Sequence, residues 1–144
     1  MKADQRAVID TPVLISAALL PDSLPALVVQ QVLNAGRLVF CDETFAELET
    51  RLWRPKFDRY LTLEARKLLL HDFVAAADWV ALQAGTVAWS RDATDDKFIA
   101  LALAGPVDLL ISGDQDLLML HQVGAVRIKN PAQTWPIVAA WVSA

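Results

Sequence analysis

The sequence contains a single cysteine, Cys41, so an intramolecular disulfide and a cysteine-based metal site are both excluded. Its two histidines, His71 and His121, have no partner at the spacing of metal ligands, and we interpret both as structural residues. No apolar run approaches the roughly 20 residues that a membrane-spanning helix needs. The N-terminal residues also lack the charge, apolar and small-residue pattern of a signal peptide, so we expect a cytoplasmic protein without membrane contact.

A general excess of positive charge is also missing. The net charge is −4 and the sequence pI is near 5.0, which argues against a protein that coats nucleic acid non-specifically. Six of the 13 basic residues nevertheless lie between positions 51 and 67, whereas acidic residues collect at 92–96 and 108–116. The basic residues are Arg51, Arg54, Lys56, Arg59, Arg66 and Lys67.

This basic band has two interpretations. A solvated helical face accounts for it without any function. A metal-dependent nuclease, however, requires a basic surface beside an acidic pocket, because the surface binds phosphates and the pocket binds the metal. On this second interpretation, Arg51, Arg54 and Lys56 are candidate RNA-binding residues.

The length of 144 residues and a hydrophobic content of 55% predict one domain, spanning residues 1–144, with material for a sizeable core. No repeat, low-complexity tract or linker divides the chain. Short β-branched or apolar runs predict strands, which are separated by helical patterns. We expect strands at 7–9, 38–41, 109–112 and 126–129, with weaker extended candidates at 79–82 and 86–89.

Helix start and stop signals fit between these strands. Thr11 is expected to cap a short helix that has Pro12 as its first residue, and Asp42 to cap a helix that ends before Pro55. Further helices are expected at 24–34, 62–77, from 95 or 96 to 104, just after Asp114, and at 131–141. Strands that alternate with helices predict an α/β fold with a mostly parallel sheet covered on both faces.

Four carboxylates are expected to meet at one edge of this sheet. Asp10 ends the first strand, and Asp114 follows the strand that ends at Ser112. Asp96 lies in the first turn of a helix, and Glu47 about one turn into another. Right-handed crossovers place strand ends and helix starts at the same edge, where parallel sheets bind ligands. Clustered carboxylates repel one another, and a hard cation such as Mg²⁺ compensates for that cost.

Each of these acids also has a purely structural interpretation. Asp114 and Asp116 can cap a helix, and Asp96 can interact with a helix dipole. Glu47 can pair with Arg51 one turn later. The charge of Asp10 at the end of an apolar strand is harder to explain in this way, and the combination of four acids favours a metal site.

Several motifs in this order resemble those of PIN domains. Asp10-Thr11-Pro12-Val13-Leu14 is similar to the opening Asp-Thr-Asn-hydrophobic-Leu motif, and Phe45-Ala46-Glu47-Leu48 occupies the place of the helical glutamate. Residues 91–102 resemble the third acidic block, and 112–117 the Thr/Ser-x-Asp-x-Asp-hydrophobic block. Residues 128–132 resemble the last strand and helix entry. The likeness covers about 7–135 and is nearest to the VapC-type toxins of toxin–antitoxin pairs.

This resemblance implies a three-layer α/β/α fold and a metal-dependent endoribonuclease with Mg²⁺ or Mn²⁺ as cofactor. It implies that Asp10, Asp96 and Asp114 bind the metal, and that Glu47 binds or orients the ion and its water. Asp95 and Asp116 would be supporting carboxylates, and Thr11 and Ser112 would supply hydroxyls that hold the ligands or the phosphate. Homodimers, an RNA substrate and a small antitoxin partner are implied as well.

Pro12 departs from the family pattern, because it replaces the asparagine whose amide helps to hold the acidic cluster. A PIN fold that has become a catalytically weak binding or regulatory module is therefore the alternative. A phosphoacceptor receiver domain, which is also an α/β fold with an acidic pocket, needs paired acids after the first strand. Thr11 and Pro12 follow Asp10 instead, so this third hypothesis ranks last.

Overall fold

The computed structural model describes residues 5–82 and 95–141. The strands are β1 (Arg6–Ile9), β2 (Arg37–Phe40), β3 (Asp78–Trp79), β4 (Leu109–Ile111), β5 (Gln122–Val123) and β6 (Val126–Lys129). The helices are α1 (Thr11–Leu19), α2 (Leu24–Ala35), α3 (Asp42–Leu52), α4 (Leu63–Ala76), α5 (Asp96–Ala104), α6 (Gln115–Leu118) and α7 (Pro131–Ala139), with a 3₁₀ turn at Pro55–Phe57. The extended candidate at 86–89 and residues 91–94 of the third motif lie outside the described residues.

The strands form one sheet in the order β3-β2-β1-β4-β6-β5. All pairs are parallel except β5 with β6, so the expectation of a mostly parallel sheet is confirmed. β1 and β4 are neighbours in the centre, with Ile9 opposite Ile111, although about a hundred residues separate them in the sequence. The carboxyl ends of these two strands therefore lie side by side.

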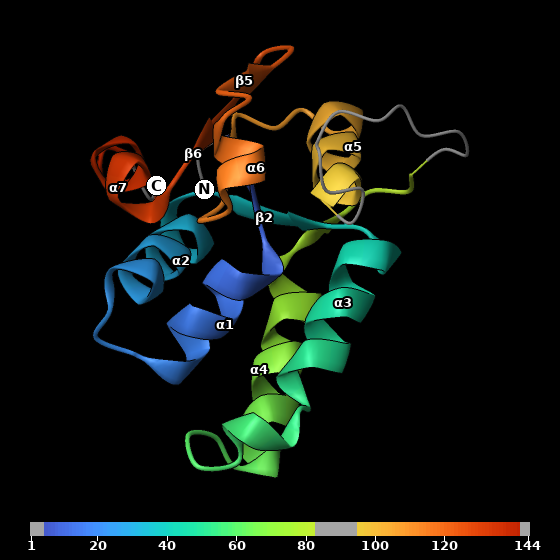
Figure 1. Cartoon of the computed structure of the whole chain (residues 1–144), viewed down its shortest axis with the longest axis vertical. Coiled ribbons are helices and arrows are strands. Elements are labelled where there is room, and N and C mark those ends of the chain that lie inside the picture. The colour runs from blue at the N-terminus through green and yellow to red at the C-terminus, as the bar shows by residue number, and fades with distance from the viewer. Residues whose placement is uncertain (1–4, 83–94, 142–144) are drawn as a thin grey trace.

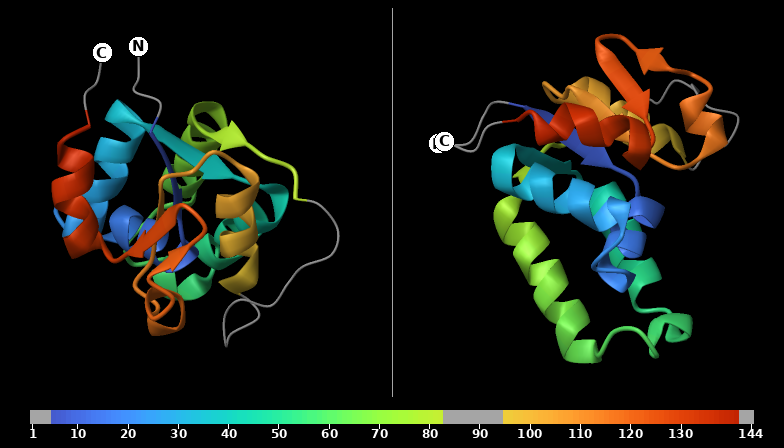
Figure 2. Two further views of the ribbon diagram at one scale, coloured as in Figure 1. Left: turned by 90° about the horizontal axis from the view of Figure 1, so that it is seen from above. Right: turned by 90° about the vertical axis from the view of Figure 1, so that its left-hand side faces the viewer.

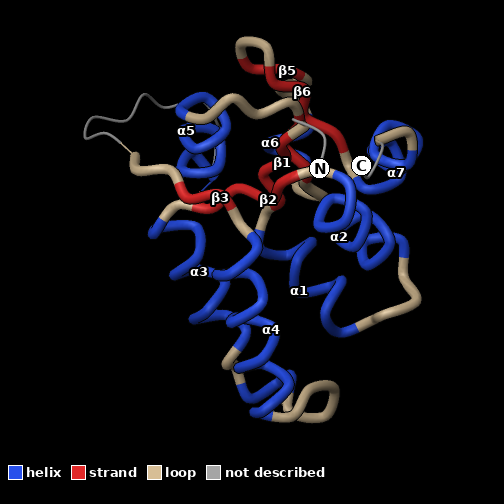
Figure 3. Tube along the Cα trace, turned by 180° about the vertical axis from the view of Figure 1, so that it is seen from behind, coloured by secondary structure: helices blue, strands red, loops and turns tan. Residues whose placement is uncertain are grey.

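Helices cover both faces of the sheet, which gives three α/β/α layers (Figures 1 and 2). Successive residues of the strands point to opposite faces. Ala7 and Ile9 of β1 join the core formed with α1–α4 and α7, whereas Val8 joins the core formed with α5 and α6. The trace in Figure 3 shows α5 on the opposite side of β2 and β3 from α3 and α4. The apolar runs of the sequence thus become strands that are buried on both faces.

Two helix starts differ from the sequence-based expectation. The N-cap of α1 is Asp10, whose carboxylate accepts a hydrogen bond from Val13 N, so Thr11 is the first helical residue and Pro12 the second. The N-cap of α3 is Cys41, whose N–H donates to Thr44 Oγ1 over 3.1 Å, so Asp42 is inside the first turn. Proline fits the first turn because no intrahelical acceptor awaits its missing N–H.

The segment from α3 to α4 projects beyond the sheet as a long helical hairpin (Figure 2). Its turn is held by Arg66, whose side chain is fully buried in α4. Nη2 of Arg66 donates to Asp58 Oδ1 and to the Leu61 carbonyl, both over 2.9 Å, and the guanidinium lies 5.9 Å from the centroid of the Trp53 ring. One member of the basic band is therefore internal and stabilises the turn.

Within the described ranges, no single helix is long and apolar enough to cross a membrane. Helices α1 and α2 satisfy that criterion only as a pair, and the chain bends by 105° between them.

Candidate metal centre

The candidate site lies at the carboxyl end of β1 and β4. Asp10 follows β1 directly, and Ser112 and Asp114 follow β4. The N-terminal ends of α1, α5 and α6 open towards the same edge of the sheet (Figure 1). Glu47 of α3 contacts Thr11 at the start of α1. The positive ends of helix dipoles favour negative charge at this edge.

Asp10 is buried, with an exposed fraction of 3%. Oδ1 accepts a hydrogen bond of 3.1 Å from Val13 N, and Oδ2 accepts one from the Ser112 hydroxyl. Burial raises the pKa of Asp10 from 3.8 to about 6; the two hydrogen bonds oppose this shift, whereas the charges of Asp114 and Glu47 add to it. Asp10 is thus a carboxylate whose charge costs stability unless a cation lies nearby.

We expect the substitution Asp10→Asn to raise the unfolding free energy of the metal-free protein by about 3 kcal/mol at neutral pH. The folded-state pKa is about 6 and lies above the ordinary 3.8, so the folded protein binds this proton more tightly than the unfolded chain. The wild type therefore loses stability relative to the variant as the pH rises through this interval, and the difference is largest above it. Asparagine keeps an oxygen for the Val13 N–H.

Denaturant titrations of both proteins in a chelator, from pH 3 to pH 8, measure this difference. The gap between the two proteins should close towards pH 3, below both pKa values, where Asp10 is mostly protonated in the folded and the unfolded state. A gap that is independent of pH would contradict the assignment of the effect to the Asp10 charge.

Ser112 and Asp114 form a chain of hydrogen bonds that starts at Asp10. The Ser112 hydroxyl donates to Asp10, and its oxygen accepts a bond of 2.9 Å from Asp114 N. Oδ1 of Asp114 in turn accepts the N–H of Asp116 over 2.8 Å and caps α6. The buried carboxylate after β1 therefore positions the backbone of the loop after β4.

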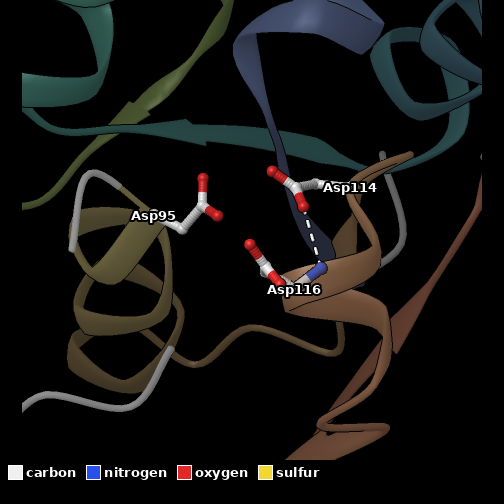
Figure 4. Close-up of side chains that lie close together, drawn as sticks. All are labelled: Asp95, Asp114 and Asp116. Atoms are coloured by element: carbon white, nitrogen blue, oxygen red, sulfur yellow. Dashed lines mark hydrogen bonds between the residues drawn. The ribbon is translucent and has the colours of Figure 1, made fainter. Parts of the chain in front are cut away.

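Three carboxylates converge beside this chain. Asp95, Asp114 and Asp116 each offer one oxygen, and these oxygens all lie within 4.8 Å of one another (Figure 4). Oxygens that share one Mg²⁺ or Mn²⁺ ion at about 2.1 Å lie at most roughly 4.2 Å apart, so small side-chain rotations suffice to close the group on a cation. A set of three carboxylate oxygens is also the donor chemistry that hard divalent ions prefer, so the residues fit such an ion.

Asp95 and Asp96 form an acidic pair at the start of α5. Asp95, expected as a supporting carboxylate, is the member of the pair that joins Asp114 and Asp116. Asp96, expected as a ligand, is the first residue of α5 and is buried, with an exposed fraction of 7%. Consecutive residues at a helix start point about 100° apart, so Asp95 and Asp96 approach this edge of the sheet from different directions.

Glu47 lies on α3, and its carboxylate interacts with three other side chains. Oε2 accepts a hydrogen bond from the Thr11 hydroxyl, and Oε1 accepts bonds from Arg51 Nη2 at 3.1 Å and Lys97 Nζ at 2.9 Å. The expected pair with Arg51 is confirmed. The contact of Lys97 with Glu47 was not expected from the sequence. The signal for it was the position of Lys97 directly after Asp95 and Asp96.

The three candidate RNA-binding residues have different environments. Arg51 is partly buried and pairs with Glu47, so it belongs to the site itself. Arg54 and Lys56 are exposed beyond the end of α3, and the Lys56 ammonium lies 5.1 Å from the centroid of the Phe57 ring. Arg54 and Lys56 are thus two exposed cations on the projecting hairpin, beyond the acidic site.

Pro12 lies exposed in the first turn of α1. Asp10, which the family's asparagine helps to hold, accepts hydrogen bonds here from Val13 N and Ser112 instead. The position of Asp10 is therefore fixed without an amide at residue 12.

Comparison with known proteins relates this arrangement to a family. A family model described as "PIN domain" matches residues 6–116. A search among curated protein sequences found no match. Among solved structures, a chain of VapBC2 from Rickettsia felis, crystallised with a DNA fragment from their promoter, is similar with a TM-score of 0.58 and 10% identity over 88% of this chain and 98% of that one. At this identity the likeness concerns the fold.

Proposed function

The chain belongs to the PIN-domain family, and from this premise we propose that it is a metal-dependent endoribonuclease that acts as the toxin of a toxin–antitoxin pair. The observation that carries the proposal is the convergence of Asp95, Asp114 and Asp116 beside the buried Asp10. Carboxylates gathered from three separate segments of the chain need a common reason, and a divalent cation supplies one.

Some residues of the site would bind the ion, and others position those ligands. Asp95, Asp114 and Asp116 would hold the ion, with Asp96 at the adjoining helix start. When bound, Mg²⁺ or Mn²⁺ supplies a water of lowered pKa and neutralises charge at the scissile phosphate. Asp10 acts through Ser112, which fixes the backbone of Asp114 and hence the direction of its carboxylate. In the reaction a water oxygen bonds to phosphorus and one P–O ester bond of the RNA breaks.

Arg54 and Lys56 are proposed to bind the RNA backbone, because both are exposed on the hairpin that leads away from the acidic site. Phosphate contacts of this kind release counterions from the RNA, and this release becomes less favourable as the salt concentration rises. The variant with Arg54→Gln and Lys56→Gln should bind RNA less tightly and show a shallower dependence of log affinity on log salt concentration. An unchanged salt dependence would exclude these two residues from the interface.

The direct test is cleavage of a mixed RNA substrate by purified protein in Mg²⁺ or Mn²⁺, beside an identical reaction in EDTA. We expect cleavage with the metals and none with the chelator, because the proposal assigns the activation of water to the bound ion. Restored cleavage after Mn²⁺ is added back in excess distinguishes metal removal from damage to the protein. If a folded, partner-free protein cleaves no RNA with either metal, the alternative of a PIN-fold binding module replaces the proposal.

The toxin role implies a small antitoxin partner, a homodimer and a place in the cytoplasm, where RNA is accessible. Its support is the sequence likeness to VapC-type toxins and the shared fold with the VapBC2 chain. Co-expression with the product of an adjacent short gene, followed by affinity capture and light scattering, tests both assemblies. A monomer that captures no such product would contradict this part of the proposal.

A further inference from the structure

Glu47 already interacts with two cations. Lys97 Nζ lies 2.9 Å and Arg51 Nη2 lies 3.1 Å from the same oxygen, Oε1. The other oxygen, Oε2, accepts the hydroxyl of Thr11. Four side chains from α1, α3 and α5 thus form one cluster, in which one carboxylate is matched by two positive groups.

Glu47, Lys97 and Arg51 together carry a formal charge of +1, and the two cations on Oε1 disfavour a divalent cation on the same oxygen. A metal ion on Oε1 at about 2.1 Å would lie at most about 5 Å from the Lys97 ammonium. Lys97 and Glu47 are both largely shielded from solvent, with side-chain exposures of 22% and 14%, so water screens this repulsion incompletely. The ion would also have to displace Lys97 or Arg51 from a charge-assisted bond.

The opposite side of the site has the reverse charge. Asp95, Asp114 and Asp116 carry three formal negative charges on oxygens within 4.8 Å of one another. The two sides therefore differ in their affinity for cations. The side with Asp95, Asp114 and Asp116 attracts a divalent ion, whereas Glu47 already interacts with the monovalent cations of Lys97 and Arg51.

We propose that Lys97 and Arg51 occupy Glu47 in place of a second divalent cation, so that the centre binds a single metal ion beside Asp95, Asp114 and Asp116. This inference rests on the proposed metal-dependent function and specifies its stoichiometry. Two-ion phosphoryl-transfer sites use the second ion to stabilise charge at the reacting phosphate. Here the ammonium and guanidinium supply fixed positive charge at that position, and Glu47 is a positioning residue that holds them.

The test counts Mn²⁺ ions per chain, by electron paramagnetic resonance of free Mn²⁺ during titration of the full chain without RNA. The wild type should bind one ion. The charge-removing variant Arg51→Gln/Lys97→Met should bind two, because Glu47 is then free to act as a ligand. The charge-conserving variant Arg51→Lys/Lys97→Arg is the matched control and should bind one.

A second readout is the rise of the thermal midpoint with Mn²⁺ concentration, since each ion that binds only the folded state adds its own logarithmic term. The slope at high Mn²⁺ should roughly double in the charge-removing variant and stay unchanged in the control. Two ions in the wild type, or one ion in a folded charge-removing variant, would overturn the inference while leaving a metal-dependent function intact. No Mn²⁺ on the wild type would instead overturn the proposed function, and this inference with it.

Discussion

Asp114→Asn is expected to lower RNA cleavage at least about 100-fold while leaving the fold intact. Loss of a supporting hydrogen bond around a metal costs about tenfold to a hundredfold, and loss of a ligand charge should cost no less. Asp114 has two roles that this substitution separates. Its Oδ1 caps α6 by accepting the Asp116 N–H, and asparagine is as good a cap as aspartate. Its negative charge in the three-carboxylate group, in contrast, is removed.

Initial cleavage rates at saturating RNA and Mn²⁺, together with the thermal midpoint, measure the two roles independently. Asp22→Asn, the same change in the exposed turn between α1 and α2, is the matched control and should cleave like the wild type. A variant that keeps more than about a tenth of the wild-type rate would mean that Asp114 is not a metal ligand. A large fall in the midpoint would mean that the loss of activity reflects unfolding.

Arg66→Ala is expected to lower the unfolding free energy by about 3 kcal/mol, which is the usual range for truncation of a large buried side chain. Arg66→Met should cost less than about 1 kcal/mol. Methionine refills most of the volume against Trp53, and it also removes a buried charge. Among the described residues, no acceptor lies within hydrogen-bonding distance of Nε or Nη1 of Arg66. Replacement of an imperfectly satisfied buried ion by an apolar side chain is often nearly neutral.

Chemical denaturation of the two variants separates packing from hydrogen bonding. The partner Asp58 is 66% exposed and is rehydrated readily when Arg66 is replaced. Arg59→Ala, on the exposed surface of the same turn, is the control and should change the unfolding free energy by less than about 0.5 kcal/mol. Equal losses for the alanine and methionine variants would show that the bonds to Asp58 and Leu61 dominate over packing.

The sequence was most informative where apolar residues form short, bounded runs. The strand expected at 126–129 has the same bounds as β6. The strand expected at 109–112 is β4, which is one residue shorter. The antiparallel β5 was not expected, because Gln122–Val123 is two residues long and has no alternation to detect. The first helix start was assigned one residue late, since Asp10 and Thr11 are both good N-caps and only the hydrogen bond from Val13 N distinguishes them.

The candidate site was predictable in its location but not in its orientation. Strand ends and helix starts indicated the edge of the sheet at which acids gather, whereas the placement of Asp95 beside Asp114 and Asp116 depends on the rotation of α5, which the sequence pattern does not give. The partners of Glu47 likewise include one that the sequence indicated and one that it did not. Arg51 lies one helical turn away and was anticipated, but Lys97 is fifty residues distant and reaches Glu47 only through the packing of α5 against α3.

The adjacency of β1 and β4 has a consequence for the protein during its own synthesis. Asp10 N donates to the carbonyl of Ile111, and the loop that carries Ser112 and Asp114 follows at once. A nascent chain that has not yet released β4 from the ribosome therefore lacks this loop and cannot assemble the candidate metal centre. Such long-range pairing is slow to form compared with local helices. For the proposed ribonuclease, this topology would delay cleavage of RNA, including the message under translation, until most of the chain has been made.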